Sequence, residues 1–191
     1  MVDVASLLNK KLPQVANRRE HQASRLFRIE TMDLTFSNGT QATYERICGG
    51  RGAVMAVPFD GTSFYLTVEY CGGTMNYGLG LVKGKIDAGE TPEQAVGREL
   101  EEEIGFGTRK VTLLKHEMTV APGMLSLKMY PFLCEELFEC VQEGDEPEPI
   151  DLVKLSISEV KDLIFAPDSV LVEGRTIAAL SLALHKLGAL N

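Results

Sequence analysis

Residues 84–106 read GKIDAGETPEQAVGRELEEEIGF, and their spacing indicates a single short helix with a defined start and end. Thr91 can cap this helix, with Pro92 at its first position and Gln94 three residues after the cap. That arrangement is a capping box followed by a residue of fixed φ. Gly105 is placed to end the helix, because glycine adopts the left-handed conformation without a Cβ penalty. The stretch therefore predicts a helix from Pro92 to the residue before Gly105.

Three glutamates share one face of this predicted helix. At about 100° per residue, Glu99 and Glu103 fall roughly 40° apart, and Glu102 lies roughly 60° to the other side of Glu99. The adjoining stripe is apolar and consists of Val96, Leu100 and Ile104. We therefore expect the carboxylates to be partly buried. Like charges held so close repel one another, and a bound cation relieves the repulsion.

Carboxylate oxygens with no cysteine or histidine nearby suit Mg²⁺, with Mn²⁺ as its substitute, rather than Zn²⁺. Magnesium completes its coordination shell with water and phosphate oxygens, which points to pyrophosphate chemistry. Arg98 is expected to form an ion pair with Glu90 that braces the preceding loop against the helix. The alternative is a surface helix with a run of glutamates. The glycine, arginine and glutamate positions around the run favour the metal site.

Composition limits the remaining choices. The chain has 191 residues and 45% hydrophobic content, which is enough for one substantial domain and a small subdomain. A net charge of −8 argues against nucleic-acid binding. The sequence contains no apolar run of membrane-spanning length and no secretion signal, so we expect no membrane association and a cytoplasmic location. The four cysteines have no CxxC spacing, and neither a zinc site nor a disulfide framework is expected.

The rest of the chain reads as strands followed by helices. Residues 1–23 are expected to form an exposed basic arm, with a nucleic-acid patch as the alternative. Strand-like runs flank Asn38-Gly39 and Asp60-Gly61, which predicts two hairpins. Two further strands, 111–121 and 126–137, are separated by a Pro-Gly break. Ser156 caps a short helix, and a last amphipathic helix closes at Gly188. This order predicts a mixed sheet sandwiched by helices.

The pattern from Gly84 through Glu90 to Arg98-Glu99-Leu100, Glu102-Glu103 and Gly105-Phe106 resembles the Nudix box of the Nudix hydrolases. Outside the box, the sequence is similar to the ADP-compound hydrolase branch of NudE type. That similarity lies in SRLFRIETMDLTFSNGT (24–40), YERI (44–47), RGAVMAVP (51–58) and EGDEPEP (143–149).

The resemblance implies an α/β Nudix fold, an α/β/α sandwich with a mixed sheet, plus a small N-terminal antiparallel strand subdomain. The implied domains are the arm (1–23), an N-terminal β subdomain that dimerises (24–49) and the Nudix hydrolase domain (50–191). The implied function is Mg²⁺-dependent hydrolysis of the pyrophosphate bond in ADP-ribose, NADH or diadenosine polyphosphates by a homodimer. The products are AMP and a phosphorylated second half.

The resemblance also implies residue roles. Glu99 and Glu103 are the direct metal ligands, Glu102 binds a further ion or its waters, and the backbone carbonyl of Lys83 completes the set. The general base comes from a loop after the box, where Glu146 is the first choice and Glu143 the second. The alternative for that loop is a solvated acidic turn.

Substrate contacts and substrate class stay open at the level of sequence. Arg51 is a candidate phosphate contact or a surface arginine, and Phe27 stacks on adenine or belongs to a strand core. Relatives usually carry arginine at the position of Val68 and glutamate at that of Gly78. These departures favour considering another substrate, either a sugar nucleotide or a nucleoside triphosphate. The other alternative is a Nudix-fold binding module without catalysis. The intact carboxylates of the box argue against it.

Overall fold

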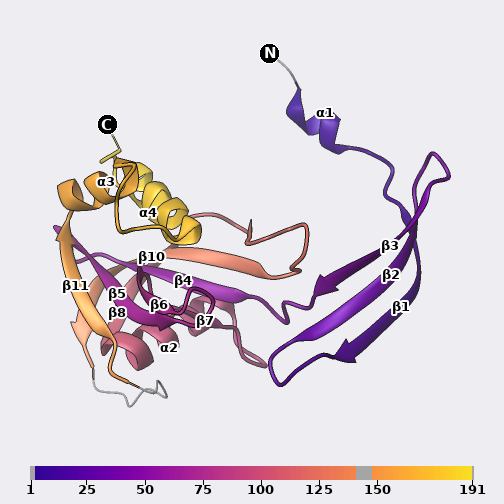
Figure 1. Ribbon diagram of the computed structural model, residues 1–191. Helices are drawn as coiled ribbons and strands as arrows, with labels where there is room; N and C mark the ends of the chain where they lie inside the picture. The colour runs from indigo at the N-terminus through magenta and orange to yellow at the C-terminus, as the bar shows by residue number, and fades with distance from the viewer. Residues whose placement is uncertain (1–2, 141–147, 191) are drawn as a thin grey trace. The chain divides into compact units, whose positions relative to one another are not determined.

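The computed structural model describes residues 3–140 and 148–190 (Figure 1). The chain divides into two compact units. The first comprises residues 1–50 together with 121–127, and the second comprises 51–120 together with 128–191. Among the described residues, no helix combines the length and the apolar character that a bilayer crossing requires.

The first unit contains a short helix, α1 (Val4–Leu8), and a three-stranded antiparallel sheet. The sheet order is β1 (Gln14–Gln22), β2 (Arg28–Thr35) and β3 (Gln41–Ile47). The predicted hairpin at Asn38-Gly39 is confirmed, because β2 and β3 pair in antiparallel register and Gly39 has a φ of 85°. Positive φ in this turn is the conformation that glycine adopts without strain.

Residues 14–22 differ from the exposed arm that the sequence predicted over 1–23. They form β1, which pairs with β2 from Gln14 opposite Thr35 to Gln22 opposite Arg28. All nine residues of β1 are exposed. The sequence of a strand without a buried face carries no apolar alternation, so only its hydrogen bonds to β2 define it.

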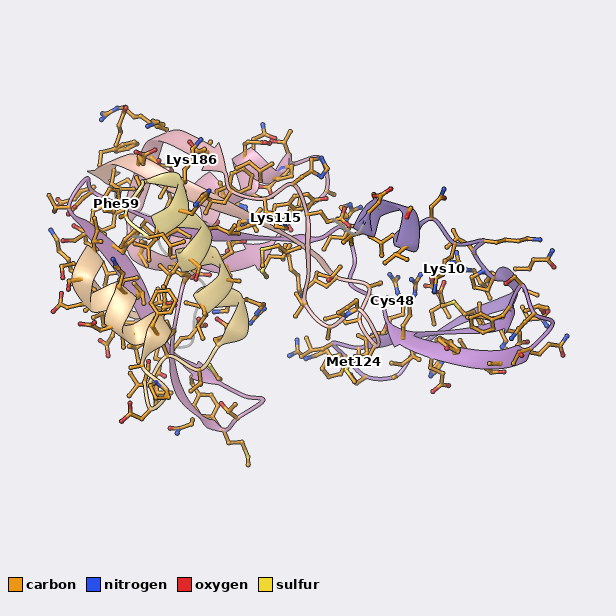
Figure 2. All side chains as sticks on the ribbon, turned by 90° about the horizontal axis from the view of Figure 1, so that it is seen from above. Lys10, Cys48, Phe59, Lys115, Met124 and Lys186 are labelled. Carbon is orange, nitrogen blue, oxygen red and sulfur yellow. The ribbon has the colours of Figure 1, made fainter. Side chains whose placement is uncertain are left out.

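A segment distant in sequence, 121–127, completes the first unit. The N–H of Ile47 donates to the carbonyl of Met124 at 2.8 Å, and the N–H of Gly49 donates to Ser126 Oγ at 2.9 Å. Figure 2 shows Cys48 and Met124 on these neighbouring segments. The predicted Pro-Gly break after Ala121 therefore begins a loop that packs on the N-terminal sheet.

The second unit contains a mixed sheet whose order is β7 (Lys83–Lys85), β4 (Ala53–Pro58), β10 (Lys128–Glu139) and β8 (Phe106–Leu113), with β9 (Met118–Thr119) also paired to β10. β4 and β10 are parallel, and the other pairs are antiparallel. A second sheet has the order β11 (Asp151–Ser156), β5 (Ser63–Cys71) and β6 (Asn76–Gly80).

Helices cover both sides of the mixed sheet (Figure 1). On one side lies α2 (Pro92–Ile104), and on the other lie α3 (Ile157–Phe165) and α4 (Gly174–Lys186). The apolar side of α2 packs into a buried cluster with β4 and β10 that includes Val54, Ala56, Val96, Leu100 and Phe132. The predicted α/β/α sandwich with a mixed sheet is confirmed, and its core fixes the position of α2.

The predicted hairpin at Asp60-Gly61 is wrong. The turn itself is closed by an antiparallel bridge between Phe59 and Phe64 and by the Asp60 N–H, which donates to the Ser63 carbonyl at 3.1 Å, but β4 and β5 then enter different sheets. All six residues of β4 are buried. A strand that is buried on both faces takes a central place in a sheet, and here its neighbours are β7 and β10.

Candidate active site

The helix α2 has the start and end that the sequence predicted. The Gln94 N–H donates to Thr91 Oγ1, and the Thr91 N–H donates to Gln94 Oε1 at 2.8 Å, so both halves of the capping box are present. Gly105 ends the helix in the left-handed conformation with a φ of 68°. Because both ends are fixed, the angular positions of the glutamates along α2 are fixed as well.

The carboxyl group of Glu99 packs directly against the backbone of β7. Glu99 is only 9% exposed, and its side chain lies where a Cβ atom on Gly84 would otherwise be. Burial raises the pKa of Glu99, and the neighbouring Arg98 guanidinium opposes that shift. Antiparallel pairing of Gly84 with Val54 in the buried strand β4 holds this contact in place.

Arg98 joins the loop before α2 to the acidic face of the helix. Its Nε donates to Glu90 Oε1 at 2.8 Å, and its Nη2 donates to the carbonyl of Lys85 at 3.0 Å. The expected ion pair with Glu90 is therefore present, and it lowers the pKa of Glu90. The sequence did not predict that Nη1 also bridges Glu99 Oε1 and Glu102 Oε2, each at 2.8 Å. These carboxylates, Glu90 first, raise the pKa of Arg98.

Glu103 has the most unusual environment of the three box glutamates. Its Oε2 is buried and has no hydrogen-bond partner among the described residues. A backbone hydrogen bond from Lys83 reaches its carboxylate. Burial raises the pKa of Glu103 to about 8, Glu69 and Glu99 act in the same direction, and the Lys83 charge opposes them. A buried carboxylate oxygen without a partner is costly unless a cation or a proton meets it.

The donor set fits a hard divalent cation. Glu99, Glu102 and Glu103 lie on one face of α2, and the peptide of Lys83 lies beside Glu103. Within the part of the chain that the structure describes, no three acidic, histidine or cysteine side chains converge into a complete metal cage. The guanidinium of Arg98 lies between two of the carboxylates. Magnesium takes few protein ligands and several waters, so one or two carboxylates and a carbonyl are sufficient.

The structure adds an ion pair that the sequence did not reveal. Lys83 Nζ pairs with Glu69 Oε1 from β5, and both side chains are largely buried. Glu69 lies opposite Gly78 in the register of β5 with β6. Residues directly opposite each other in an antiparallel pair share one face of the sheet, so Glu69 and Gly78 lie on the same face. The pairing of that face with Lys83 is a tertiary contact.

The other predicted residues lie in separate places. Arg51 is exposed at the start of the second unit, and Phe27, which is 51% exposed, belongs to the first unit. Glu143 and Glu146 lie outside the described residues. The alternative assignment of Phe27 to a strand core is therefore wrong, because this side chain is exposed.

The two departures from the usual pattern lie on neighbouring strands. Val68 lines a cavity of about 270 Å³ together with Tyr70 and Tyr77, whose rings meet edge to face at 5.7 Å. A Cβ atom on Gly78 would lie 3.0 Å from Cys71 Sγ. The described residues that line this cavity include three carboxylates but no lysine or arginine.

Comparison with known proteins agrees with this geometry. Residues 50–175 match the NUDIX domain, and residues 13–46 match the NudE-type Nudix hydrolase N-terminal domain. The ADP compounds hydrolase NudE of Escherichia coli K12 is 42% identical over 171 residues, which cover 89% of this chain and 90% of that protein. The ADP-ribose pyrophosphatase of Bacillus subtilis is 35% identical over 83 residues, covering 42% of this chain and 44% of that protein.

A solved structure described as an ADP compounds hydrolase superposes with a TM-score of 0.84 at 40% identity. It covers 94% of this chain and 97% of the other. The family match extends over more than half of the chain and contains the complete acidic face of α2. The chain therefore belongs to the NUDIX family of hydrolases.

Proposed function

We propose that this enzyme hydrolyses the pyrophosphate bond of ADP-linked compounds and releases AMP together with a phosphorylated second product. The observation that carries the proposal is the buried oxygen of Glu103, which lacks a hydrogen-bond partner among the residues that the structure describes and lies beside Glu99 in an intact box. The substrate class follows the names of its relatives, an ADP compounds hydrolase and an ADP-ribose pyrophosphatase. ADP-ribose, NADH and diadenosine polyphosphates are the candidates.

The proposed cofactor is Mg²⁺, with Mn²⁺ as a substitute, held by Glu99, Glu103 and the Lys83 carbonyl, with Glu102 beside them. When bound, such a cation neutralises phosphate oxygens and lowers the pKa of a coordinated water. A divalent cation of this kind agrees with a donor set made of hard oxygens.

The chain itself prepares the site through Arg98. By donating to Glu90 and to Lys85, the guanidinium fixes the loop, and by donating to Glu99 and Glu102 it orients both carboxylates. Such preorganisation lowers the reorganisation needed when charge develops at phosphorus.

A carboxylate then accepts the proton of the attacking water. We propose Glu146 for this role and Glu143 as the second choice, both of which lie outside the described residues. Arg51 is proposed to contact phosphate and Phe27 to stack on the adenine ring. Exchange of Glu146 or Glu143 for glutamine separates the two candidates, because only loss of the true base removes the rise of the rate with pH on the acid side of the profile.

A homodimer formed through the N-terminal β subdomain (24–49) is part of the proposal. Large apolar side chains on this unit are exposed, among them Leu26 at 61% and Tyr44 at 51%. Exposed large apolar side chains are the kind of surface that a protein interface covers. Light scattering of the purified protein tests this point, and a monomer contradicts it. The free thiols favour a cytoplasmic location, which completes the proposal.

A second substrate class is kept open by Val68. An apolar side chain at this place removes a cationic contact for an anionic group, and the adjoining cavity has acidic and aromatic walls. A nucleoside diphosphate derivative with an uncharged second half, such as a sugar nucleotide, carries no phosphate in that half and therefore needs no cationic side chain there. A nucleoside triphosphate fits these walls less well.

One experiment separates these substrates. The protein is incubated with Mg²⁺ and each of ADP-ribose, NADH, diadenosine triphosphate, a sugar nucleotide and a nucleoside triphosphate, and the products are quantified by chromatography. AMP from the first three is the expected result. Turnover restricted to the sugar nucleotide or the triphosphate supports the second class instead. Tight nucleotide binding without any product identifies a binding module.

A further inference from the structure

Lys83 places a positive charge beside the carboxylates that are proposed to bind the cation. Its backbone is hydrogen-bonded to Glu103, and its side-chain charge acts on the same carboxylate. The Lys83 side chain is 21% exposed, so water screens its charge only in part. Lysine is a point charge on a flexible stem with three donors, and it can approach any nearby carboxylate.

An ammonium group and a divalent cation compete for the same carboxylate oxygen. Glu103 Oε2 is buried, and within the described residues it has no hydrogen-bond partner. A lysine that was free to turn toward this oxygen would satisfy it. In the structure Lys83 Nζ instead pairs with Oε1 of Glu69, a carboxylate from β5 whose side chain is 27% exposed.

The surroundings leave Glu69 as the acceptor for Lys83. Gly80 lies beside this ion pair, since a Cβ atom there would be 3.8 Å from both Glu69 Oε1 and Lys83 Nζ. Glu173 is also near, with Oε2 3.6 Å from the same point. Its Oε2, however, accepts a hydrogen bond from Thr176, and its Oε1 forms an ion pair with Arg175, although that oxygen has no well-oriented hydrogen bond among the described residues. Glu173 is therefore engaged elsewhere.

We propose that Glu69 is a positioning residue that holds the Lys83 ammonium away from Glu103 and so keeps the unpaired Glu103 oxygen available to a divalent cation. This inference rests on the proposed function, because it concerns the same cation. In this proposal Glu69 is not a ligand of the cation. It acts only through Lys83, and that dependence distinguishes it from a carboxylate that merely adds negative charge to the site.

A double-mutant cycle on cation affinity tests the inference. Calorimetry measures the dissociation constant of Mn²⁺ for the full-length wild type, Glu69→Gln, Lys83→Met and the double variant, without substrate. Glu69→Gln is expected to weaken binding about tenfold or more, as loss of groups that orient metal ligands does. Lys83→Met is expected to bind at least as tightly as the wild type. In the Lys83→Met background the Glu69→Gln change is expected to have no effect, because no ammonium remains to be held.

Three outcomes overturn the inference. The first is an equal loss from Glu69→Gln in both backgrounds, which means that Glu69 acts through its charge alone. The second is no loss in the wild-type background, and the third is a tenfold loss from Lys83→Met. If Glu69→Gln does not fold by circular dichroism, Glu69→Asp takes its place in the cycle.

Glu135→Gln is the matched control, since Glu135 on β10 forms a comparable ion pair with Lys110 on β8 at 2.8 Å. This variant is expected to leave cation affinity unchanged. A wild-type protein that binds no Mn²⁺ overturns the proposed function itself, and that result is distinct from a cycle without coupling.

Discussion

The carboxyl group of Glu99 fills the space that the missing Cβ of Gly84 leaves free. A Cβ atom at position 84 would lie 1.9 Å from the carboxyl carbon of Glu99 and 2.0 Å and 2.1 Å from its two oxygens. The first glycine of the box is thus required for steric reasons. It allows the acidic face of α2 to approach the backbone of β7, and the site cannot form without that approach.

Gly84→Ala is expected to destabilise the protein by about 1–3 kcal/mol, because Glu99 must leave its place or β7 must shift. The affinity of this variant for the cation, measured by calorimetry, is expected to fall as well. Gly97→Ala is the control, since a Cβ at this helical position meets nothing within 4 Å. It is expected to raise stability by about 0.5–1 kcal/mol through helix propensity. Equal denaturation midpoints for the two variants contradict the steric argument.

Glu103→Gln removes the charge of a buried carboxylate but keeps its shape. Turnover is expected to fall about a thousandfold or more, the equivalent of several kcal/mol of lost transition-state stabilisation. In the absence of cation the melting temperature is expected to stay the same or rise, since a group that is costly to ionise has been neutralised. Glu101→Gln on the same helix serves as the control in product assays. Near wild-type turnover of the Glu103→Gln enzyme would contradict the role assigned to Glu103.

Cation affinity is expected to depend on pH through Glu103, whose pKa is raised from 4.5 to about 8. Below pH 8 the folded, cation-free protein holds a proton on this carboxyl group, and binding must release it. Affinity therefore falls by up to about tenfold for each unit that pH drops below 8. Calorimetry in buffers of different ionisation enthalpy measures the released proton. A flat profile between pH 6 and 8 contradicts the assignment.

The same pKa shift predicts how cation-free stability changes with pH. Between pH 4.5 and 8 the folded state binds a proton at Glu103 that the unfolded state has lost. Stability conferred by this group is therefore greatest at the acid end and decreases as pH rises through that window. Thermal unfolding in the presence of a chelator measures the trend, and in Glu103→Gln this contribution is expected to disappear.

Arg98→Ala leaves Glu90, Glu99 and Glu102 without their common partner. Because the Arg98 side chain is only 25% exposed, the loss is expected to cost about 2–3 kcal/mol. Arg98→Lys is expected to recover less than half of this, since a single ammonium cannot reproduce the forked contacts of a guanidinium. Urea denaturation with and without Mn²⁺ measures both variants. A lysine variant as stable as the wild type shows that the forked geometry has no role.

Local sequence signals predicted the parts of the fold that depend on nearest neighbours. The capping box at Thr91, the left-handed end at Gly105 and the turn at Gly39 each need only a few adjacent residues. Their conformations follow from backbone sterics and short-range hydrogen bonds, and the structure has all three. The second capping box, at Ser156, belongs to the same group.

Strand partners were predicted less well, because partners are chosen over long distances. The turn at Asp60 has the residues of a hairpin, yet β4 pairs with β7 and β10. Its fully buried character decided this, since only a central place in the sheet covers both of its faces. β1 escaped prediction for the opposite reason, since it buries neither face and carries no periodic signal.

The sequence by itself determined that Glu99, Glu102 and Glu103 share one helical face, because 3.6 residues per turn fix their angles once the caps fix the helix. Only the tertiary structure decided what each carboxylate meets. Arg98 lies between two of them, the backbone of Lys83 contacts the third, and Glu69 arrives from another sheet to hold the lysine side chain. The physical reason is that burial and ion pairing depend on where separate strands meet α2. No local pattern specifies that.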